Sequence, residues 1–261
     1  MQLVDSHCHL DRIDLGKEKI DFPQLMQNAT EAQVQHLLCV AISMDQFPDM
    51  VATAESYQQV SFSCGVHPLH VGEDEKFKLE QLKDLASQER VVAIGETGLD
   101  YYYSKDSIQM QQDYFAHHIN VANELDKPLI VHTRDARKDT IDILKANNAD
   151  KCSGVLHCFT ENWEMAKAAL DINFYISISG IVTFKNAVEL QDVVRKIPME
   201  RLLIETDSPY LAPVPKRGKQ NQPAYVKHVA EFIAGLKGVS VEEVAEVTTN
   251  NFKSLFKQAK V

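Results

Sequence analysis

Residues 4–11 read VDSHCHLD, an apolar and β-prone run that ends in two histidines separated by one cysteine. Because successive side chains of a strand point to opposite faces, His7 and His9 are expected on one face and Cys8 on the other. Asp5 is expected on the histidine face, one layer deeper. A His-x-His pair alone is weak evidence of a metal site, so the meaning of this segment depends on the rest of the chain.

Short apolar runs of the same character recur along the chain, separated by amphipathic segments with helical periodicity. Eight such strand–helix units within 261 residues predict an α/β fold of the (β/α)8, or TIM-barrel, class. The expected strands are 2–7, 36–42, 60–66, 91–96, 128–132, 154–158, 174–178 and 201–206. The clearest helical segments are 107–126, 185–197, about 222–236 and 240–258, and the last begins with a capping-box pattern at Ser240 and Glu243.

An open, doubly wound sheet is the alternative architecture. No Gly-x-Gly-x-x-Gly motif follows the first apolar run, which disfavours a dinucleotide-binding sheet. The chain also has no obvious repeat, low-complexity tract or Pro/Gly/Ser-rich linker. We therefore expect a single domain over residues 1–261.

Composition restricts the classes of function. The formal net charge of −10 argues against a protein that coats duplex DNA, although it is compatible with a nuclease that holds a few nucleotides locally. The five cysteines form no C-x-x-C pair, which favours buried, reduced thiols. The start of the chain lacks the pattern of a signal peptide, and no apolar run approaches the roughly 18 residues of a membrane span. These features favour a cytoplasmic protein.

Polar residues recur where the predicted strands end. In a barrel these positions meet at the C-terminal face, where such enzymes carry their chemistry. Imidazole and carboxylate groups in this number predict a divalent-metal site, and they exceed what one tetrahedral ion uses, so a binuclear centre fits. The groups that predict the metal site are His7, His9, Glu96, His132, His157 and Asp207, and His67 lies at another such strand end.

Several motifs, in this combination and order, resemble the TatD family of metal-dependent deoxyribonucleases, within the amidohydrolase-like metal-dependent hydrolases. They are DSHCHLD, GVHP, GETGLDYYY, KPLIVHTRDA, GVLHCFT and ETDSPYLAP. The stretches FYISISGIVTFKNA and PVPKRGKQNQPAYV are most similar to the YcfH branch of that family. The resemblance extends from about residue 3 to residue 256.

The resemblance implies a barrel with two divalent ions, zinc, manganese or magnesium, at the strand C-termini. It assigns one ion to His7, His9, Glu96 and Asp207, and the other to Glu96, His132 and His157, with Glu96 bridging. It further implies that Asp207 acts as the general base on a metal-activated water. The implied activity is hydrolysis of DNA phosphodiesters, leaving 5′-phosphomonoesters, so the expected partner is a nucleic-acid substrate, with single-stranded DNA as one candidate.

Further residues are expected around this centre. Asp5 and Glu205 each precede a predicted ligand by two residues, so they are candidates to hydrogen bond to ligating groups, or else form a buried polar cluster. His67 is a candidate contact to substrate phosphate or leaving group, or a structural loop residue. The candidates for phosphate binding are Arg134, which could instead pair with Asp135 or Asp139, and Lys216 and Arg217 in a basic loop that could equally be solvated.

The same metal chemistry would also polarise a carbonyl group. An alternative function is therefore hydrolysis of an ester or amide, such as deacylation of aminoacyl-tRNA or a small-molecule amidohydrolase reaction. A metal-binding protein without catalytic activity is a third hypothesis, and the intact Glu96 and Asp207 argue against it.

One of the tyrosines at 101–103 could stack on a base, although at least one is expected to pack in the core.

Overall fold

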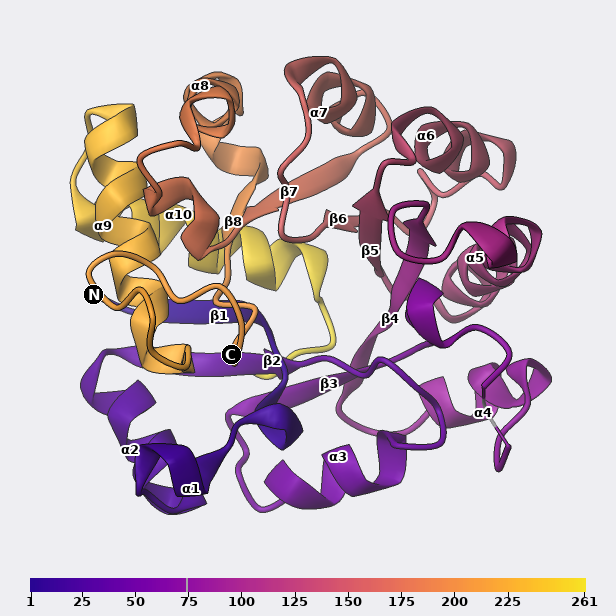
Figure 1. Cartoon of the computed structure of the whole chain (residues 1–261), viewed down its shortest axis with the longest axis horizontal. Coiled ribbons are helices and arrows are strands. Elements are labelled where there is room, and N and C mark those ends of the chain that lie inside the picture. Colours follow the sequence, from indigo (N-terminus) through magenta and orange to yellow (C-terminus); the bar gives the residue numbers. More distant parts are fainter. Residues whose placement is uncertain (74) are drawn as a thin grey trace.

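Eight parallel strands in sequential order form the centre of the computed structural model, which describes residues 1–73 and 75–261 (Figure 1). Backbone hydrogen bonds join the two ends of the sheet just beyond β8, from Asp207 N to His7 O at 2.9 Å and from His9 N to Ser208 O at 2.8 Å. This arrangement confirms the predicted (β/α)8 barrel. The strands are β1 (Leu3–Cys8), β2 (Val34–Cys39), β3 (Val60–Cys64), β4 (Val91–Asp100), β5 (Leu129–Arg134), β6 (Gly154–Leu156), β7 (Phe174–Ile178) and β8 (Leu202–Ile204).

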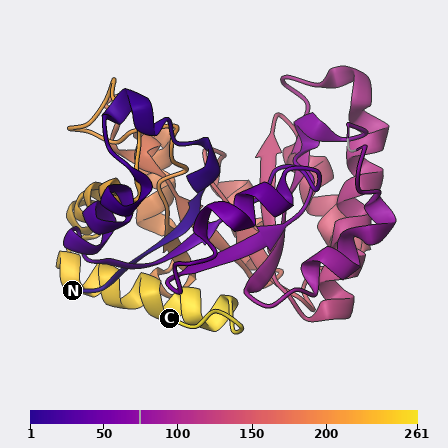
Figure 2. The same ribbon diagram turned by 90° about the horizontal axis from the view of Figure 1, so that it is seen from below.

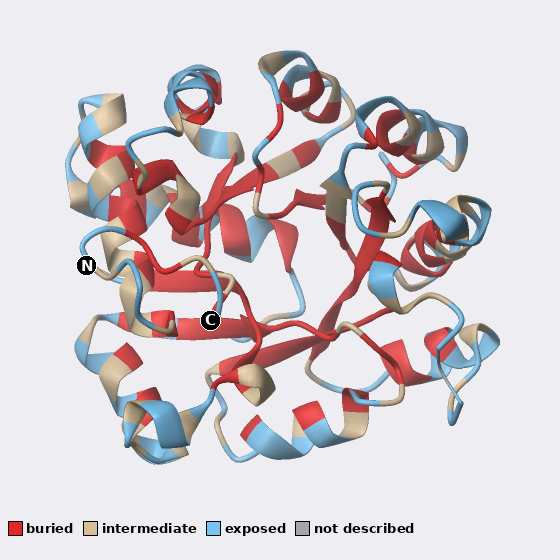
Figure 3. Cartoon of the chain, in the orientation of Figure 1, coloured by how far each residue is buried: buried red, intermediate tan, exposed pale blue. Residues whose placement is uncertain are grey.

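Helices surround the sheet on its outer side, and Figure 3 shows that the strands are buried while the outer helical surfaces are exposed. Apolar residues of both layers share one large cluster, which is the main source of stability in such a fold. The helices are α1 (Leu15–Glu18), α2 (Phe22–Glu31), α3 (Phe47–Ala54), α4 (Leu82–Ala86), α5 (Ile108–Leu125), α6 (Arg137–Ala146), α7 (Trp163–Leu170), α8 (Val188–Lys196), α9 (Val226–Lys237) and α10 (Val241–Leu255). None of those within the described ranges has the length and apolar composition that a membrane crossing requires.

The last helix closes the N-terminal end of the barrel. Phe252 of α10 and the adjacent Phe256 pack against Val4 and Val92, which lie near the starts of their strands. Figure 2 shows α10 running across the lower edge of the molecule. Ser240 caps this helix as expected, because its hydroxyl accepts a hydrogen bond from Glu243 N at 3.1 Å. One end of the barrel is thus sealed by apolar packing, which leaves the C-terminal end for the polar residues.

β4 is longer than its sequence predicts, and this is the main correction to the strand boundaries. It continues to Asp100, so Glu96 lies inside the strand instead of ending it. Two glycines explain why the sequence is misleading, because glycines close together in a sequence are typical of a turn. In the structure Gly95 and Gly98 instead lie within β4, with φ values of +140° and +134°. A Cβ atom on Gly98 would lie 2.0 Å from the backbone oxygen of His132, so glycine permits the close approach of β4 to β5.

The cysteines agree with the expectation of reduced, mostly buried thiols. In the described ranges no disulfide joins any of the five, and Cys158 alone is partly exposed. The Cys8 thiol points away from the neighbouring histidines and lies 3.4 Å from the backbone oxygen of Leu38. Burial raises the pKa of this thiol well above its usual value, so Cys8 is neutral at physiological pH.

His118 makes folding stability depend on pH. It lies buried in α5, where Nδ1 donates to Tyr114 O at 2.7 Å and Nε2 accepts from Val66 N at 3.0 Å. Burial lowers its pKa to about 4, so between pH 6.5 and pH 4 the unfolded chain binds a proton that the folded chain does not. This histidine therefore contributes stability at neutral pH that is lost as the pH falls through that window.

We expect metal-stripped wild-type protein to lose about 2 kcal/mol of unfolding free energy through this histidine between pH 7 and pH 5. The His118→Gln variant should be less stable at pH 7 but should lose about 2 kcal/mol less on acidification. Urea denaturation at several pH values measures both, and the other histidines cancel in the comparison. Equal pH dependence of the two proteins would contradict the assignment.

Candidate metal centre

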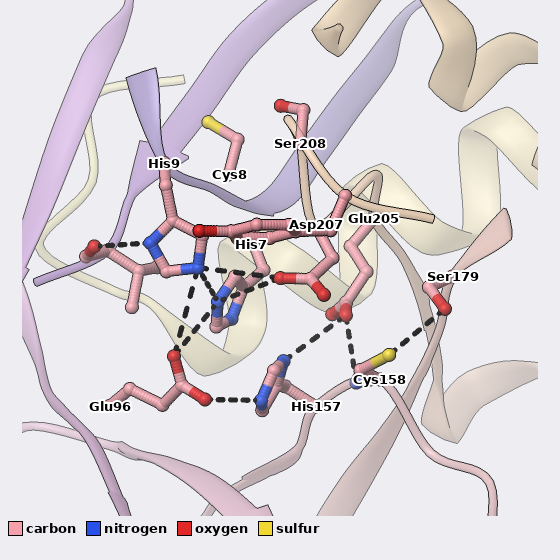
Figure 4. A network of polar contacts seen from close by, with 12 residues as sticks. His7, Cys8, His9, Glu96, His157, Cys158, Ser179, Glu205, Asp207 and Ser208 are labelled. Carbon is pink, nitrogen blue, oxygen red and sulfur yellow. Dashed lines mark hydrogen bonds and ion pairs between the residues drawn. The ribbon is translucent and has the colours of Figure 1, made fainter. Parts of the chain in front are cut away.

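The predicted ligands converge on a cavity of about 730 Å³ at the C-terminal end of the barrel. Figure 4 shows His7, His9, Glu96, His157 and Asp207 directed toward one another from four different strands or their extensions. His7 and Asp207 are brought together by the closure of β1 on the segment after β8. The cavity is lined by His9, His67, Glu96, His132, His157, Arg134 and Asp207, among others.

The two oxygens of Glu96 face two different groups of nitrogens. Oε2 lies 3.4 Å from His7 Nε2 and 3.9 Å from His9 Nε2. Oε1 lies 2.7 Å from His157 Nε2 and 3.3 Å from His132 Nδ1. A carboxylate held between two sets of imidazoles has the geometry of a bridging ligand.

The outer hydrogen bonds of three histidines leave the inner nitrogens as acceptors. His9 Nδ1 donates to Val40 O at 2.9 Å, and His157 Nδ1 donates to Glu205 Oε1 at 3.3 Å. His132 is turned the other way, with Nε2 donating to a carboxylate oxygen of Asp100 at 3.2 Å. When these rings are neutral, as metal ligation requires, the outer hydrogen bonds keep the single N–H of each ring on the outer nitrogen and leave a lone pair on the inner one.

Asp207 completes the group on the β1 side. Its Oδ1 lies 3.4 Å from His9 Nε2 and 3.7 Å from His7 Nε2. The residue has a φ of +55°, a conformation that aspartate tolerates better than most residues. His7, His9 and Asp207 therefore offer three ligand atoms close enough to share one ion, as do His67, Glu96 and His132 on the other side.

The donor set fits divalent cations. His157 Nε2 is buried and lies 2.7 Å from Glu96 Oε1, which is a spacing that two ligands of one cation can adopt. Burial alone raises the pKa of Glu96, but the charge of His157 and the hydrogen bonds from His132 and His157 outweigh it and hold that pKa well below its usual value. For Asp207, burial is likewise outweighed, by the hydrogen bond from His9, and its pKa is lowered. Two ionised carboxylates among imidazoles are suitable ligands for zinc, manganese or a similar ion.

Glu205 and Asp5, predicted to support the ligands, have different surroundings. Glu205 is fully buried and accepts hydrogen bonds from His157 and from Cys158 N, the latter at 2.8 Å. Asp5 instead accepts from Thr206 N at 2.8 Å and Thr206 Oγ1 at 2.5 Å. These contacts fit the alternative expectation for Asp5, a buried polar cluster, and the pairing register of β1 with β2 shifts between Asp5 and Cys8, which interrupts the regular alternation from Asp5 to the histidines.

His67 lies beside the ligands in a tautomer suited to donation. Its Nδ1 accepts a hydrogen bond from Leu69 N at 3.1 Å, so in the neutral ring Nε2 carries the proton. That Nε2 lies 3.4 Å from Glu96 Oε1. Burial lowers the pKa of His67 to about 3, so the ring is neutral. The arrangement favours a hydrogen-bond donor over a metal ligand.

The three basic candidates for phosphate binding lie at different distances from the centre. Arg134 lines the cavity, and in the part of the chain that the structure describes it forms no ion pair with Asp135 or Asp139. Lys216 and Arg217 do not line it: the Lys216 ammonium lies 5.2 Å from the ring centre of Tyr225, and the Arg217 guanidinium 3.8 Å from that of Phe184. The expectation that Lys216 and Arg217 bind substrate phosphate from this loop, outside the cavity, stays a prediction.

The sequence analysis missed Asp100, which holds His132 in place. Its Oδ2 accepts from His132 Nε2, and its Oδ1 accepts from Tyr102 N at 3.0 Å and Tyr103 N at 2.8 Å. Burial by itself raises the pKa of Asp100, but these hydrogen bonds lower that pKa by more. The net result is a pKa below the usual value, so Asp100 is anionic. The available signal was its spacing of four residues from Glu96, which places both on one side of a strand that extends that far.

Comparison with known proteins agrees with this geometry. The family model described as "TatD related DNase" matches residues 4–257. An uncharacterized metal-dependent hydrolase, YcfH of Escherichia coli K12, is 53% identical over 256 residues, covering 98% of this chain and 96% of that protein. Another, YabD of Bacillus subtilis 168, is 40% identical over 255 residues, covering 98% and 99%.

A solved structure resembles the whole chain. The crystal structure of YJJV, a TatD homologue from Escherichia coli K12, superposes with a TM-score of 0.90 at 27% sequence identity and covers 98% of both chains. The family match therefore extends over the barrel, the cavity and every predicted ligand position. With groups of histidines and carboxylates at the end of the barrel that could hold a metal ion, this chain belongs to the TatD family of metal-dependent hydrolases.

Proposed function

We propose that the protein is a metal-dependent nuclease that hydrolyses phosphodiester bonds of DNA. The observation that carries this proposal is the position of Glu96 between two groups of imidazoles, with Arg134, whose guanidinium forms no ion pair among the described residues, lining the same cavity. Two cations held by these residues, together with the arginine beside them, would attract an anionic substrate. The description of the matching family as a DNase supports the same class of reaction.

His7, His9, Glu96 and Asp207 would hold one divalent cation, and Glu96, His132 and His157 a second. Such ions supply a water of lowered pKa and positive charge that stabilises a phosphorane-like transition state. Glu205 and Asp100 orient His157 and His132 through hydrogen bonds to their outer nitrogens. These contacts set the tautomers that ligation requires.

The protein's own groups would move the protons. Asp207, ionised and directed into the cavity, accepts a proton as the water oxygen forms its bond to phosphorus. The bond from phosphorus to the 3′-oxygen breaks, His67 Nε2–H would donate a hydrogen bond to that leaving oxygen, and the oxygen takes its proton from Asp207 or from solvent water. The products are a strand with a free 3′-hydroxyl and a 5′-phosphomonoester.

A nuclease assay tests this function directly. Single-stranded DNA labelled at its 5′ end is incubated with the protein in Mg²⁺, Mn²⁺ or EDTA. Metal-dependent shortening from the 3′ end would establish an exonuclease, and internal fragments an endonuclease. Absence of cleavage by protein shown to contain two metal ions would contradict the proposal, and aminoacyl-tRNA and small esters would then be the substrates to assay.

A further inference from the structure

Two tyrosines and an arginine form an exposed cluster beside the cavity. Tyr102 and Tyr103 are 52% and 64% exposed, and their ring centres lie 4.7 Å apart in an edge-to-face arrangement. The guanidinium carbon of Arg134 lies 4.3 Å from the first ring centre and 4.6 Å from the second. We call these three residues the aromatic platform. Adjacent exposed aromatic side chains form a contiguous patch, and such patches mark interaction sites more often than single exposed residues do.

The platform is connected to the metal centre through Asp100. One oxygen of this carboxylate accepts the backbone N–H groups of Tyr102 and Tyr103, and the other accepts from His132, a proposed ligand. Arg134 follows His132 by two residues in β5 and lines the cavity itself. The platform is thereby held at a fixed position relative to the reacting centre, which lowers the entropy cost of binding.

The neighbouring tyrosine shows that this exposure is specific. Tyr101 packs against the main core, and its hydroxyl donates to Asp139 Oδ2 at 2.9 Å and accepts from Gln112 Nε2 at 2.7 Å. Of the three consecutive tyrosines, the first anchors the loop, and the next two are left on the surface with a guanidinium that no carboxylate neutralises in the described ranges.

We propose that the aromatic platform binds an unpaired nucleobase of the strand whose phosphate enters the metal centre, an inference that rests on the proposed nuclease function. A base can stack on the tyrosine rings or the guanidinium plane, and Arg134 can also reach a flanking phosphate. The face of a base is available in a single strand, whereas in a duplex neighbouring base pairs cover it. The platform therefore selects single strands with little preference for sequence.

A binding experiment tests the platform without relying on cleavage. Metal-loaded protein is titrated into a phosphorothioate-linked hexanucleotide that contains 2-aminopurine, whose fluorescence falls when the base stacks. Wild-type protein should quench it. The Tyr102→Ala/Tyr103→Ala double variant should bind roughly 5- to 150-fold more weakly and quench less, as expected for the loss of stacking on one base.

Matched variants separate stacking from other effects. Tyr102→Phe/Tyr103→Phe keeps both ring faces and should bind and quench like wild type. Val188→Ala removes an equally exposed apolar side chain on α8 and should change nothing. Both tyrosines are exposed, so the alanine variant should fold, and its thermal unfolding temperature checks this.

A kinetic comparison adds an independent readout. The alanine variant should have a higher KM for single-stranded DNA than wild type. Its kcat and KM for methyl p-nitrophenyl phosphate, a diester without a base, should be unchanged. Equal binding and quenching by wild type and the alanine variant would refute the platform even if DNA is cleaved. Platform-dependent binding without any metal-dependent cleavage would instead refute the nuclease function and leave the platform standing.

Discussion

The Glu96→Gln variant should contain fewer metal ions per chain than wild type and should hydrolyse single-stranded DNA roughly 10³-fold more slowly. The reason is that both carboxylate oxygens of Glu96 face imidazole nitrogens, on opposite sides. An amide replaces one of these oxygens with an NH₂ group, which cannot ligate a cation. It also removes the negative charge that balances two cations. Metal analysis of dialysed protein, together with the nuclease assay, measures both effects.

A surface carboxylate provides the control for this variant. Glu124 forms an exposed ion pair with Lys83, so Glu124→Gln makes the same chemical change far from the cavity and should leave metal content and activity unaffected. Glutamine is similar in size to glutamate, and the metal-stripped Glu96→Gln protein should remain folded. Full metal content with full activity in Glu96→Gln would show that the residue does not bridge two ions.

The Asp207→Asn variant should lower kcat by roughly 10²- to 10⁴-fold, the usual contribution of a positioned general base. Asp207 is held at the cavity by the closure of the barrel, with its carboxylate oxygen 3.4 Å from His9 Nε2. Asparagine keeps the shape and one ligand oxygen but cannot accept the proton of the attacking water. Steady-state kinetics with the metal concentration varied to saturation measures the effect.

Saturating metal separates the two roles assigned to Asp207. If its carboxylate acts as a base, kcat stays low when the variant is fully loaded. If it serves as a ligand alone, excess metal restores wild-type kcat, and the role as a base is disproved. Asp142→Asn, which changes an exposed aspartate paired with Lys138 on α6, is the matched control and should behave like wild type.

Much of the architecture could be predicted because it depends on local patterns. Apolar runs of strand length alternate with amphipathic segments, and each pattern follows from which face of the element is buried. The histidines and carboxylates near strand ends then indicate a metal site, since all parallel strands of a barrel end on the same face. The parts of this interpretation that depend on one strand alone, such as His7 and His9 flanking Cys8, need no tertiary information.

Positions that depend on pairing between strands could not be predicted in this way. Gly95 and Gly98 resemble a turn until β5 is placed beside them, and the continuation of β4 then brings Asp100 to His132. Likewise, regular alternation in β1 places Asp5 below the histidines, whereas the register shift directs it to Thr206.

The sequence by itself determined the succession of strands and helices and the kinds of ligand available, because hydrophobic periodicity and side-chain chemistry are local properties. Only the tertiary structure decided which oxygen of Glu96 faces which histidines and which nitrogen of each ring is turned inward. It also decided that Arg134 lies on Tyr102 and Tyr103 instead of pairing with a carboxylate. These choices depend on contacts between residues distant in the chain, which exist only once the barrel has closed.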